Sequence, residues 1–172
     1  VFLDRVYIGY LLVSDEIKPE AAQTITALRA LGVKHVVMLT GDNQKIAERV
    51  ARALGIDEFL AELLPEQKVE AVEGLKGELK KGKRLAFVGD GINDAPVLMV
   101  ADLGIAMGAL GSDAAIEAAD IILMDDRIDR IPMAIRIARF TRKVVIQNIV
   151  MALLVKAVFL TFGAFGLATI WE

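Results

Sequence analysis

Short apolar segments alternate with amphipathic segments over roughly the first 130 residues. A β-branched strand is predicted at 33–39; it runs into Thr40–Asn43, after which apolar residues recur at helical spacing until Gly55. A second strand at 85–88 leads in the same way into 89–94 and a short helix. Further strands are predicted at 103–106 and 121–124, and helices at 19–31, 67–79 and 128–139. This alternation predicts an α/β fold whose mostly parallel sheet is covered by helices on both faces.

The pattern changes near the end of the chain. From Ile149 to Trp171 the only charged residue is Lys156, and about 23 helical residues span roughly 35 Å, enough to cross a hydrocarbon core of about 30 Å. A buried core helix is the alternative, but such helices are shorter and have a polar face. We therefore predict three parts: a soluble domain at 1–130, a basic amphipathic junction helix at 131–145 and a transmembrane helix at 146–171.

Four cations precede the predicted span: Arg136, Arg139, Arg142 and Lys143. Because cationic residues flank the cytoplasmic end of a membrane helix, the soluble domain is expected to face the cytoplasm. Trp171 suits the opposite interface.

Composition narrows the function classes. The 172 residues suffice for one domain, and the 55% hydrophobic share is accounted for by the apolar tail. A net charge of −3 provides no basic field for nucleic acid, and the absence of Cys excludes disulfides and thiolate metal ligands. The chain starts without Met or a leader pattern, which we interpret as a cut in a longer protein.

Candidate chemistry lies where strands end. Thr40 and Gly41, followed by Asp42, stand before a helix whose N-terminus favours an oxyanion such as phosphate. Asp90 and Asp94, four residues apart among glycines, offer the hard oxygen ligands that Mg²⁺ prefers. Lys68 begins a helix, where it could neutralise a phosphoryl group. Each loop alone could be a turn or a helix cap, but their succession at strand ends predicts one phosphate and metal site.

These segments resemble a known family. Thr40–Asn43, the Pro65–Lys68 helix start and the string GDGINDAP at 89–96 resemble motifs of the haloacid dehalogenase superfamily in their P-type ATPase form. The resemblance covers essentially the whole chain and implies a Rossmann-like parallel sheet, a partial one in this chain. It also implies a pump that uses ATP and Mg²⁺ and cycles through an aspartyl phosphate.

The resemblance further implies a role for each motif residue. Thr40 and Gly41 would hold the phosphoryl oxygens, and Asp42 would position that loop and nearby nucleotide. Lys68 would offset phosphoryl charge. Asp90 would ligate Mg²⁺, and Asn93 and Asp94 would complete the site.

The chain departs from the family pattern in one respect. The family's phosphorylated aspartate lies in an Asp-Lys-Thr-Gly-Thr string, which this sequence lacks. Asp4 follows an apolar run but has the wrong neighbours. In the family the missing aspartate ends a strand between those that end at Thr40 and Val88, so this chain should lack a central strand and should not turn over ATP alone. The nucleotide-binding domain, the actuator domain and the other membrane helices are also expected in the parent protein.

Lys156 suggests which ion is moved. A charge within a membrane span is costly and therefore indicates a functional site, with snorkelling to the interface as the alternative. The segment 147–156 resembles a helix of the heavy-metal exporters, and its Lys resembles that of the zinc-, cadmium- and lead-exporting branch in the plasma membrane. We expect His35 to cap or pack rather than bind metal.

Two other functions use the same loops. One is a soluble phosphatase of the same superfamily, which would need its nucleophile and no apolar tail. The other is a non-catalytic remnant that binds Mg²⁺ or phosphate.

Overall fold

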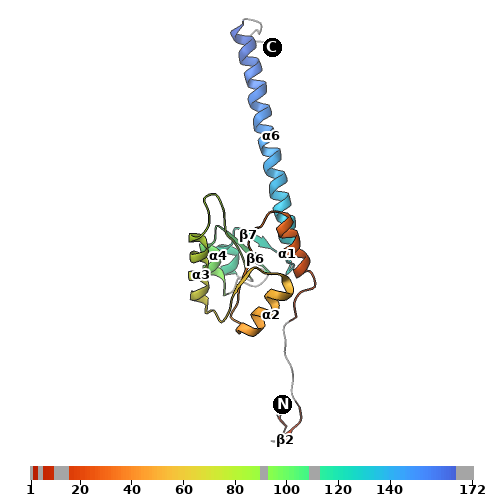
Figure 1. Cartoon of the computed structure of the whole chain (residues 1–172). Coiled ribbons are helices and arrows are strands. Elements are labelled where there is room, and N and C mark those ends of the chain that lie inside the picture. The colour runs from red at the N-terminus through yellow and green to blue at the C-terminus, as the bar shows by residue number, and fades with distance from the viewer. Residues whose placement is uncertain (1, 4–5, 10–15, 90–92, 109–112, 166–172) are drawn as a thin grey trace. The chain divides into compact units, whose positions relative to one another are not determined.

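The computed structural model describes residues 2–3, 6–9, 16–89, 93–108 and 113–165. The chain divides into two compact units, 1–129 and 130–172. The first contains the alternating strands and helices, and the second contains one long helix (Figure 1).

The first unit is built from short elements. Its strands are β1 (Phe2–Leu3), β2 (Val6–Tyr7), β3 (Val37–Leu39), β4 (Glu58–Leu60), β5 (Ala86–Gly89), β6 (Leu103–Met107) and β7 (Ile121–Leu123). Its helices are α1 (Ala21–Ala30), α2 (Gln44–Leu54), α3 (Pro65–Gly77), α4 (Ala95–Val100) and α5 (Asp113–Ala118). The predicted α/β class with flanking helices is confirmed, and β4 is an additional strand that the apolar pattern did not reveal.

The strands of this unit form two parallel sheets and a separate hairpin. Strand β3 pairs with β4 in parallel, and β5, β6 and β7 form a parallel sheet in that order. Strands β1 and β2 pair antiparallel. Within the described residues β3 and β5 are not paired with each other, so the single sheet expected from the alternation is divided in two. The division lies between the strands ending near Thr40 and Val88, where the family resemblance leaves a strand missing.

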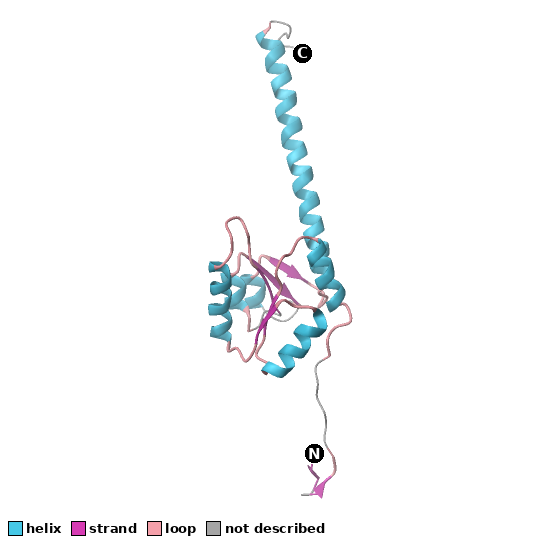
Figure 2. Ribbon diagram, viewed as in Figure 1, coloured by secondary structure: helices cyan, strands magenta, loops and turns pink. Residues whose placement is uncertain are grey.

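Helix α4 packs at the centre of the three-stranded sheet. It contacts β5 and β6 as well as α3 and α5, and its Leu98 is buried together with Ala106 of β6. Gly104 makes this approach possible, because a Cβ there would lie 2.7 Å from the Leu98 carbonyl oxygen. Figure 2 shows the strands of the two parallel sheets between the helix pair α3 and α4 and the pair α1 and α2.

Local signals explain where the helices begin and end. The Asn43 side chain accepts a hydrogen bond from the Ile46 amide and caps α2, and Gly55 ends α2 in the left-handed conformation. Helix α3 begins with Pro65, whose missing N–H costs nothing there, and the Gln67 side chain accepts from the Leu64 amide. These caps fix the ends of the segments that carry the candidate site.

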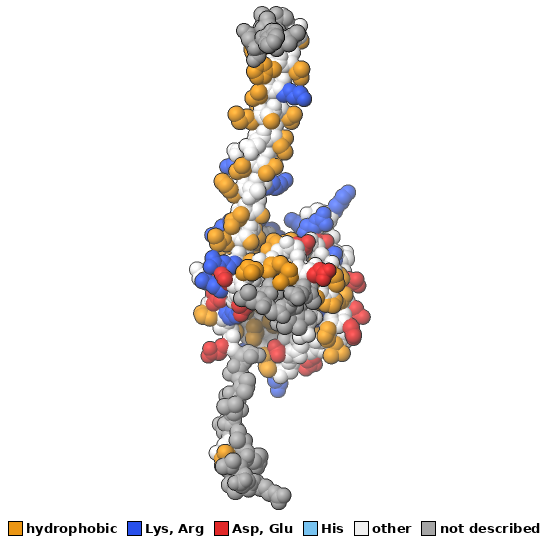
Figure 3. All heavy atoms as spheres, turned by 180° about the vertical axis from the view of Figure 1, so that it is seen from behind, with side chains coloured by type: hydrophobic (Ala, Val, Ile, Leu, Met, Phe, Trp, Pro, Cys, Tyr) orange, Lys and Arg blue, Asp and Glu red, His pale blue; other side chains and the backbone are white. Residues whose placement is uncertain are grey.

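The second unit is dominated by α6 (Arg130–Ala164), a helix of 35 residues. By length and composition it is the one described helix able to cross a membrane, and none of its apolar window is buried. It runs without a break through the predicted junction segment 131–145 and most of the predicted span at 146–171. In Figure 3 it bears apolar side chains interspersed with basic ones. Trp171 lies outside the described residues.

Candidate functional site

The loop after β3 forms a compact turn around Thr40. The Thr40 hydroxyl donates to Oδ2 of Asp42 at 2.8 Å and accepts from the Asp42 amide at 3.1 Å. The Asp42 carboxylate therefore holds the hydroxyl at the mouth of α2. The Gly41 position is open: the nearest atom to an added Cβ would be the Leu63 carbonyl oxygen at 3.5 Å.

A second loop is bonded to the first through the backbone. The Glu62 amide donates to the Asp42 carbonyl at 2.9 Å, and the Leu63 amide donates to the Thr40 carbonyl at 3.1 Å. Glu62 has φ 58°, an uncommon conformation for a residue with a side chain, and this geometry turns the chain from β4 into α3. The role of Glu62 and Leu63 was not foreseen from the sequence, since backbone hydrogen bonds leave no residue signature.

The same turn brings Lys68 to a third loop. Lys68 lies in the first turn of α3, and its ammonium donates to Oδ1 of Asp94 at 2.8 Å. The two side chains are 20% and 11% exposed, so the ion pair is largely removed from water. The ion pair joins the starts of α3 and α4. The structure thus brings together Thr40, Gly41 and Asp42 through the 62–63 loop and joins Lys68 to Asp94.

Gly89 permits the position of Asp94. A Cβ at Gly89 would lie 2.8 Å from Oδ2 and 2.9 Å from Cβ of Asp94. Asp94 is therefore packed directly against the end of β5, and only glycine fits there without displacing it. A glycine next to an aspartate is typical of a turn, whereas the contribution of Gly89 is the space it leaves for the carboxylate.

The described part of this loop offers oxygen ligands of the kind that Mg²⁺ prefers. Asn93 is exposed and Asp94 provides a carboxylate, but one oxygen of Asp94 is already bound by Lys68. The described residues contain no group of three or more His, Asp or Glu side chains suited to hold a metal. Asp90, the principal predicted ligand, lies outside the described residues, as does Asp4.

His35 lies at the other end of β3. Its Nε2 is 3.1 Å from Oε2 of Glu58, and its Nδ1 is 3.8 Å from Oδ2 of Asp57. The His35 side chain is 55% exposed, so the residue is held by polar contacts rather than by packing. The pKa of Asp57 lies below its ordinary value because the Val36 amide and the Arg29 guanidinium donate to its carboxylate.

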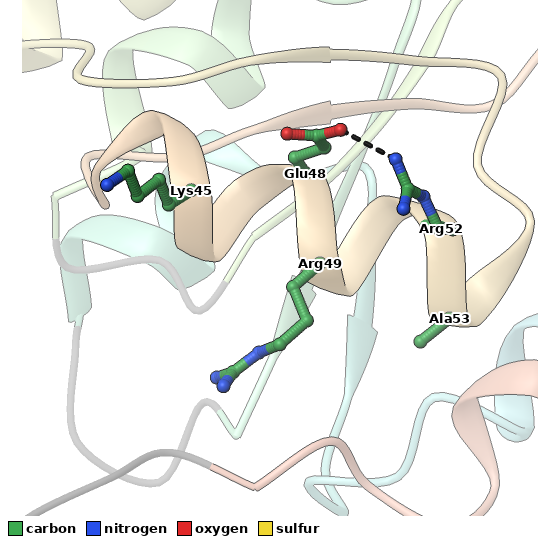
Figure 4. Close-up of a pocket in the computed structure, with 5 residues that line it drawn as sticks. All are labelled: Lys45, Glu48, Arg49, Arg52 and Ala53. Carbon is green, nitrogen blue, oxygen red and sulfur yellow. Dashed lines mark hydrogen bonds and ion pairs between the residues drawn. The ribbon is translucent and has the colours of Figure 1, made fainter.

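A shallow groove lies along the outer face of α2. Figure 4 shows its lining residues, Lys45, Glu48, Arg49, Arg52 and Ala53, and the 2.7 Å ion pair between Glu48 and Arg52. None of the predicted site residues lines this groove. Lys156 lies in α6, in the second unit.

Known proteins resemble the chain along its whole length. The family model of the haloacid dehalogenase-like hydrolases matches residues 1–102. A cadmium, zinc and cobalt-transporting ATPase of Bacillus subtilis is 56% identical over 172 residues, which are the entire chain and 24% of that protein. A zinc-transporting ATPase of Synechocystis is 56% identical over 170 residues, 99% of the chain and 23% of that protein.

A solved structure extends the similarity to three dimensions. A zinc-transporting PIB-type ATPase in its E2.Pi state matches with a TM-score of 0.80 and 44% identity, over 91% of this chain and 25% of the other. The chain therefore spans about a quarter of the length of the relatives it matches.

Proposed function

This chain belongs to the haloacid dehalogenase-like hydrolase family, and on that premise we propose that it is part of an ATP-driven pump that exports a divalent heavy metal ion. It comprises the C-terminal part of the phosphorylation domain at 1–130, a junction segment at 131–145 and a membrane helix at 146–171. The observation that carries the proposal is the joining of the strand-end loops through Glu62 and Leu63 and through the Lys68–Asp94 ion pair, in a chain that continues into α6.

The loop after β3 binds the phosphoryl group. The Thr40 hydroxyl and the Gly41 amide hold two of its oxygens, and the exposed Asp42 positions the loop beside the nucleotide. In the structure the Thr40 hydroxyl donates to the Asp42 carboxylate. When a phosphoryl group binds, the hydroxyl donates to a phosphoryl oxygen instead, so the hydrogen bonding of this turn changes when phosphate is present.

Lys68 stabilises the negative charge that builds up during phosphoryl transfer. Asp94 holds the ammonium 2.8 Å away in a place where water is largely excluded, which strengthens its electrostatic effect. In the family the transfer passes through an aspartate of the parent protein: its carboxylate attacks the γ-phosphorus of ATP, ADP leaves, and water later cleaves the acylphosphate. Asp90, with Asn93 and Asp94, would hold Mg²⁺, which would supply further charge neutralisation to this chemistry.

Helix α6 anchors the pump. Its length and apolar composition suit a bilayer span, and the cations at 136–143 favour the cytoplasmic side for residues 1–130 in a plasma membrane. Lys156 lies about 15 Å along the helix from residue 146, near the middle of the hydrocarbon core. A cation at that depth supports a part in transport, and we propose Zn²⁺, Cd²⁺ or Pb²⁺ as the exported ion.

Metal-stimulated ATP hydrolysis by the full-length protein tests this function. We expect stimulation by zinc, cadmium or lead that exceeds stimulation by copper. Lys156→Ala should reduce this stimulation, whereas Lys80→Ala, a cation of an exposed loop, should leave it unchanged. Equal zinc stimulation in Lys156→Ala would remove the basis for the ion assignment. Recovery of the expressed chain in the soluble fraction without detergent would instead favour a soluble phosphatase.

A further inference from the structure

The first part of α6 has two distinct faces. Arg136, Arg139 and Lys143 recur at spacings of three and four residues, and Arg142 adjoins Arg139 at a spacing of three, so the four cations form one continuous surface. Met133, Ile137 and Phe140 follow the same spacings along another face and are 51%, 55% and 69% exposed. A basic face beside an exposed apolar face is typical of a helix at a membrane surface.

Acidic residues do not balance these cations within the helix. The sequence of α6, from Arg130 to Ala164, contains neither Asp nor Glu. The helix sequence therefore contributes only positive formal charge, which favours an anionic partner.

The position of the cations along the helix identifies that partner. If the hydrocarbon core begins at residue 146, Lys143 lies about 5 Å outside it and Arg136 about 15 Å outside it. A headgroup layer is roughly 5–7 Å thick, and a Debye length adds about 8 Å. All four cations therefore lie within electrostatic reach of lipid phosphates, and the Lys and Arg side chains can extend toward them.

We propose that Arg136, Arg142 and Lys143, on the basic face of α6, bind the headgroups of anionic phospholipids in the cytoplasmic leaflet. This inference rests on the membrane placement of α6 in the proposed function and adds a ligand class to it. It goes beyond the topological role of flanking cations, because a topological signal requires no preference among lipids once the helix is inserted. Polybasic segments next to a membrane helix bind anionic lipids by this electrostatic attraction.

Lipid selectivity in vesicles tests the inference. The chain is reconstituted in phosphatidylcholine vesicles with about 30 mol % phosphatidylglycerol, and the association of each spin-labelled lipid with the protein is measured. Phosphatidylglycerol should be preferred by up to about fivefold for each cation that reaches a headgroup, and salt at about 1 M should reduce the preference. Both leaflets have the same composition, so the result does not depend on the orientation of the protein.

Charge variants test whether the preference for phosphatidylglycerol arises from the basic face of α6. The triple variant Arg136→Gln, Arg142→Gln, Lys143→Gln should bring the two lipids close to equal association. The matched control Lys80→Gln, Lys81→Gln, Lys83→Gln removes the same charge from a loop of the first unit and should keep the preference. The charge-conserving variant Arg136→Lys, Arg142→Lys should keep it as well.

The outcomes separate two failures. A chain that stays out of both kinds of vesicle would overturn the membrane span, and the lipid inference with it. An inserted chain that binds both lipids equally, or that loses its preference equally in both triple variants, would overturn the lipid inference alone. Equal binding by the inserted wild type would mean that acidic groups of the protein, rather than lipids, neutralise this face.

Discussion

The ammonium of Lys68 lies 2.8 Å from Oδ1 of Asp94, which joins the first turn of α3 to the residue that precedes α4. Both residues belong to segments that the sequence picked out for phosphate and metal chemistry, but separate tasks were expected of them. Their contact means that the proposed phosphoryl-binding cation and the proposed metal-site carboxylate depend on each other.

Removing either member of this pair should leave the other charge uncompensated. We expect Lys68→Met and Asp94→Asn each to lower the free energy of unfolding by about 1–3 kcal/mol. In the double variant this free energy should fall by less than the sum of the two single effects. Chemical unfolding in detergent micelles, followed by circular dichroism, measures this. The control is the Glu48–Arg52 pair, which is equally short but 54% and 81% exposed and should contribute less than about 1 kcal/mol. Additive effects at Lys68 and Asp94 would contradict the coupling.

Asp90→Asn should abolish formation of the phosphorylated intermediate in the full-length protein. The substitution removes a carboxylate charge that we propose holds Mg²⁺, and a metal ion there would neutralise much of the charge on the transferring phosphoryl group. Acid-stable incorporation of label from γ-labelled ATP measures the intermediate. Glu73→Gln removes a carboxylate from the exposed surface of α3 and should leave labelling intact. Normal labelling in Asp90→Asn would refute the assignment of this residue.

Gly89→Ala should disturb the ion pair without touching either charge. The new methyl group would lie 2.8 Å from Oδ2 of Asp94, so the carboxylate must move, at a cost of about 1–3 kcal/mol in stability. Phosphorylation of the full-length protein should fall with it.

Two other glycines provide the controls for Gly89. Gly74→Ala, within α3 and with no atom within 4 Å of the new Cβ, should be neutral or stabilising. In Gly104→Ala the new Cβ would lie 2.7 Å from the Leu98 carbonyl oxygen, so this substitution should lower stability without a specific effect on phosphorylation. If Gly104→Ala and Gly89→Ala reduced phosphorylation equally at equal stability, the effect of Gly89 would be general rather than specific to the site.

The stability of the first unit should fall at acid pH, in part because the Asp102 carboxylate becomes protonated. The Leu85 amide, with Lys76 and Arg84 nearby, holds the pKa of Asp102 below its ordinary value of 3.8. A carboxylate with a lowered folded-state pKa stabilises the fold above the unfolded-state value, and that stabilisation is lost as the pH falls through the folded-state value. Between roughly pH 6 and pH 3, the melting temperature of Asp102→Asn should therefore fall less steeply than that of the wild type. An identical decline in both proteins would contradict this role.

Much of the fold could be predicted because its signals are local. The helix that follows Thr40–Asn43 begins at an Asn cap and ends at Gly55, as the sequence indicates, and the apolar runs at 85–88, 103–106 and 121–124 are strands within a residue or two. Strand β4 was missed because Glu58–Leu60 is too short to show a period of two, and its assignment depends on pairing with β3. The strand predicted at 33–39 is confined to Val37–Leu39, the residues that pair with β4.

The sequence by itself determined which residues are candidates for the chemistry and that α6 is long and apolar enough for a membrane, because residue type, spacing and composition are properties of the chain alone. The tertiary structure decided how those residues meet: the backbone bonds of Glu62 and Leu63, the fit of Asp94 against Gly89 and the contact of Lys68 with Asp94. It also decided that β3 and β5 lie in separate sheets within the described residues. These features depend on which distant segments approach each other, and approach is governed by packing and hydrogen bonding across the fold rather than by local pattern.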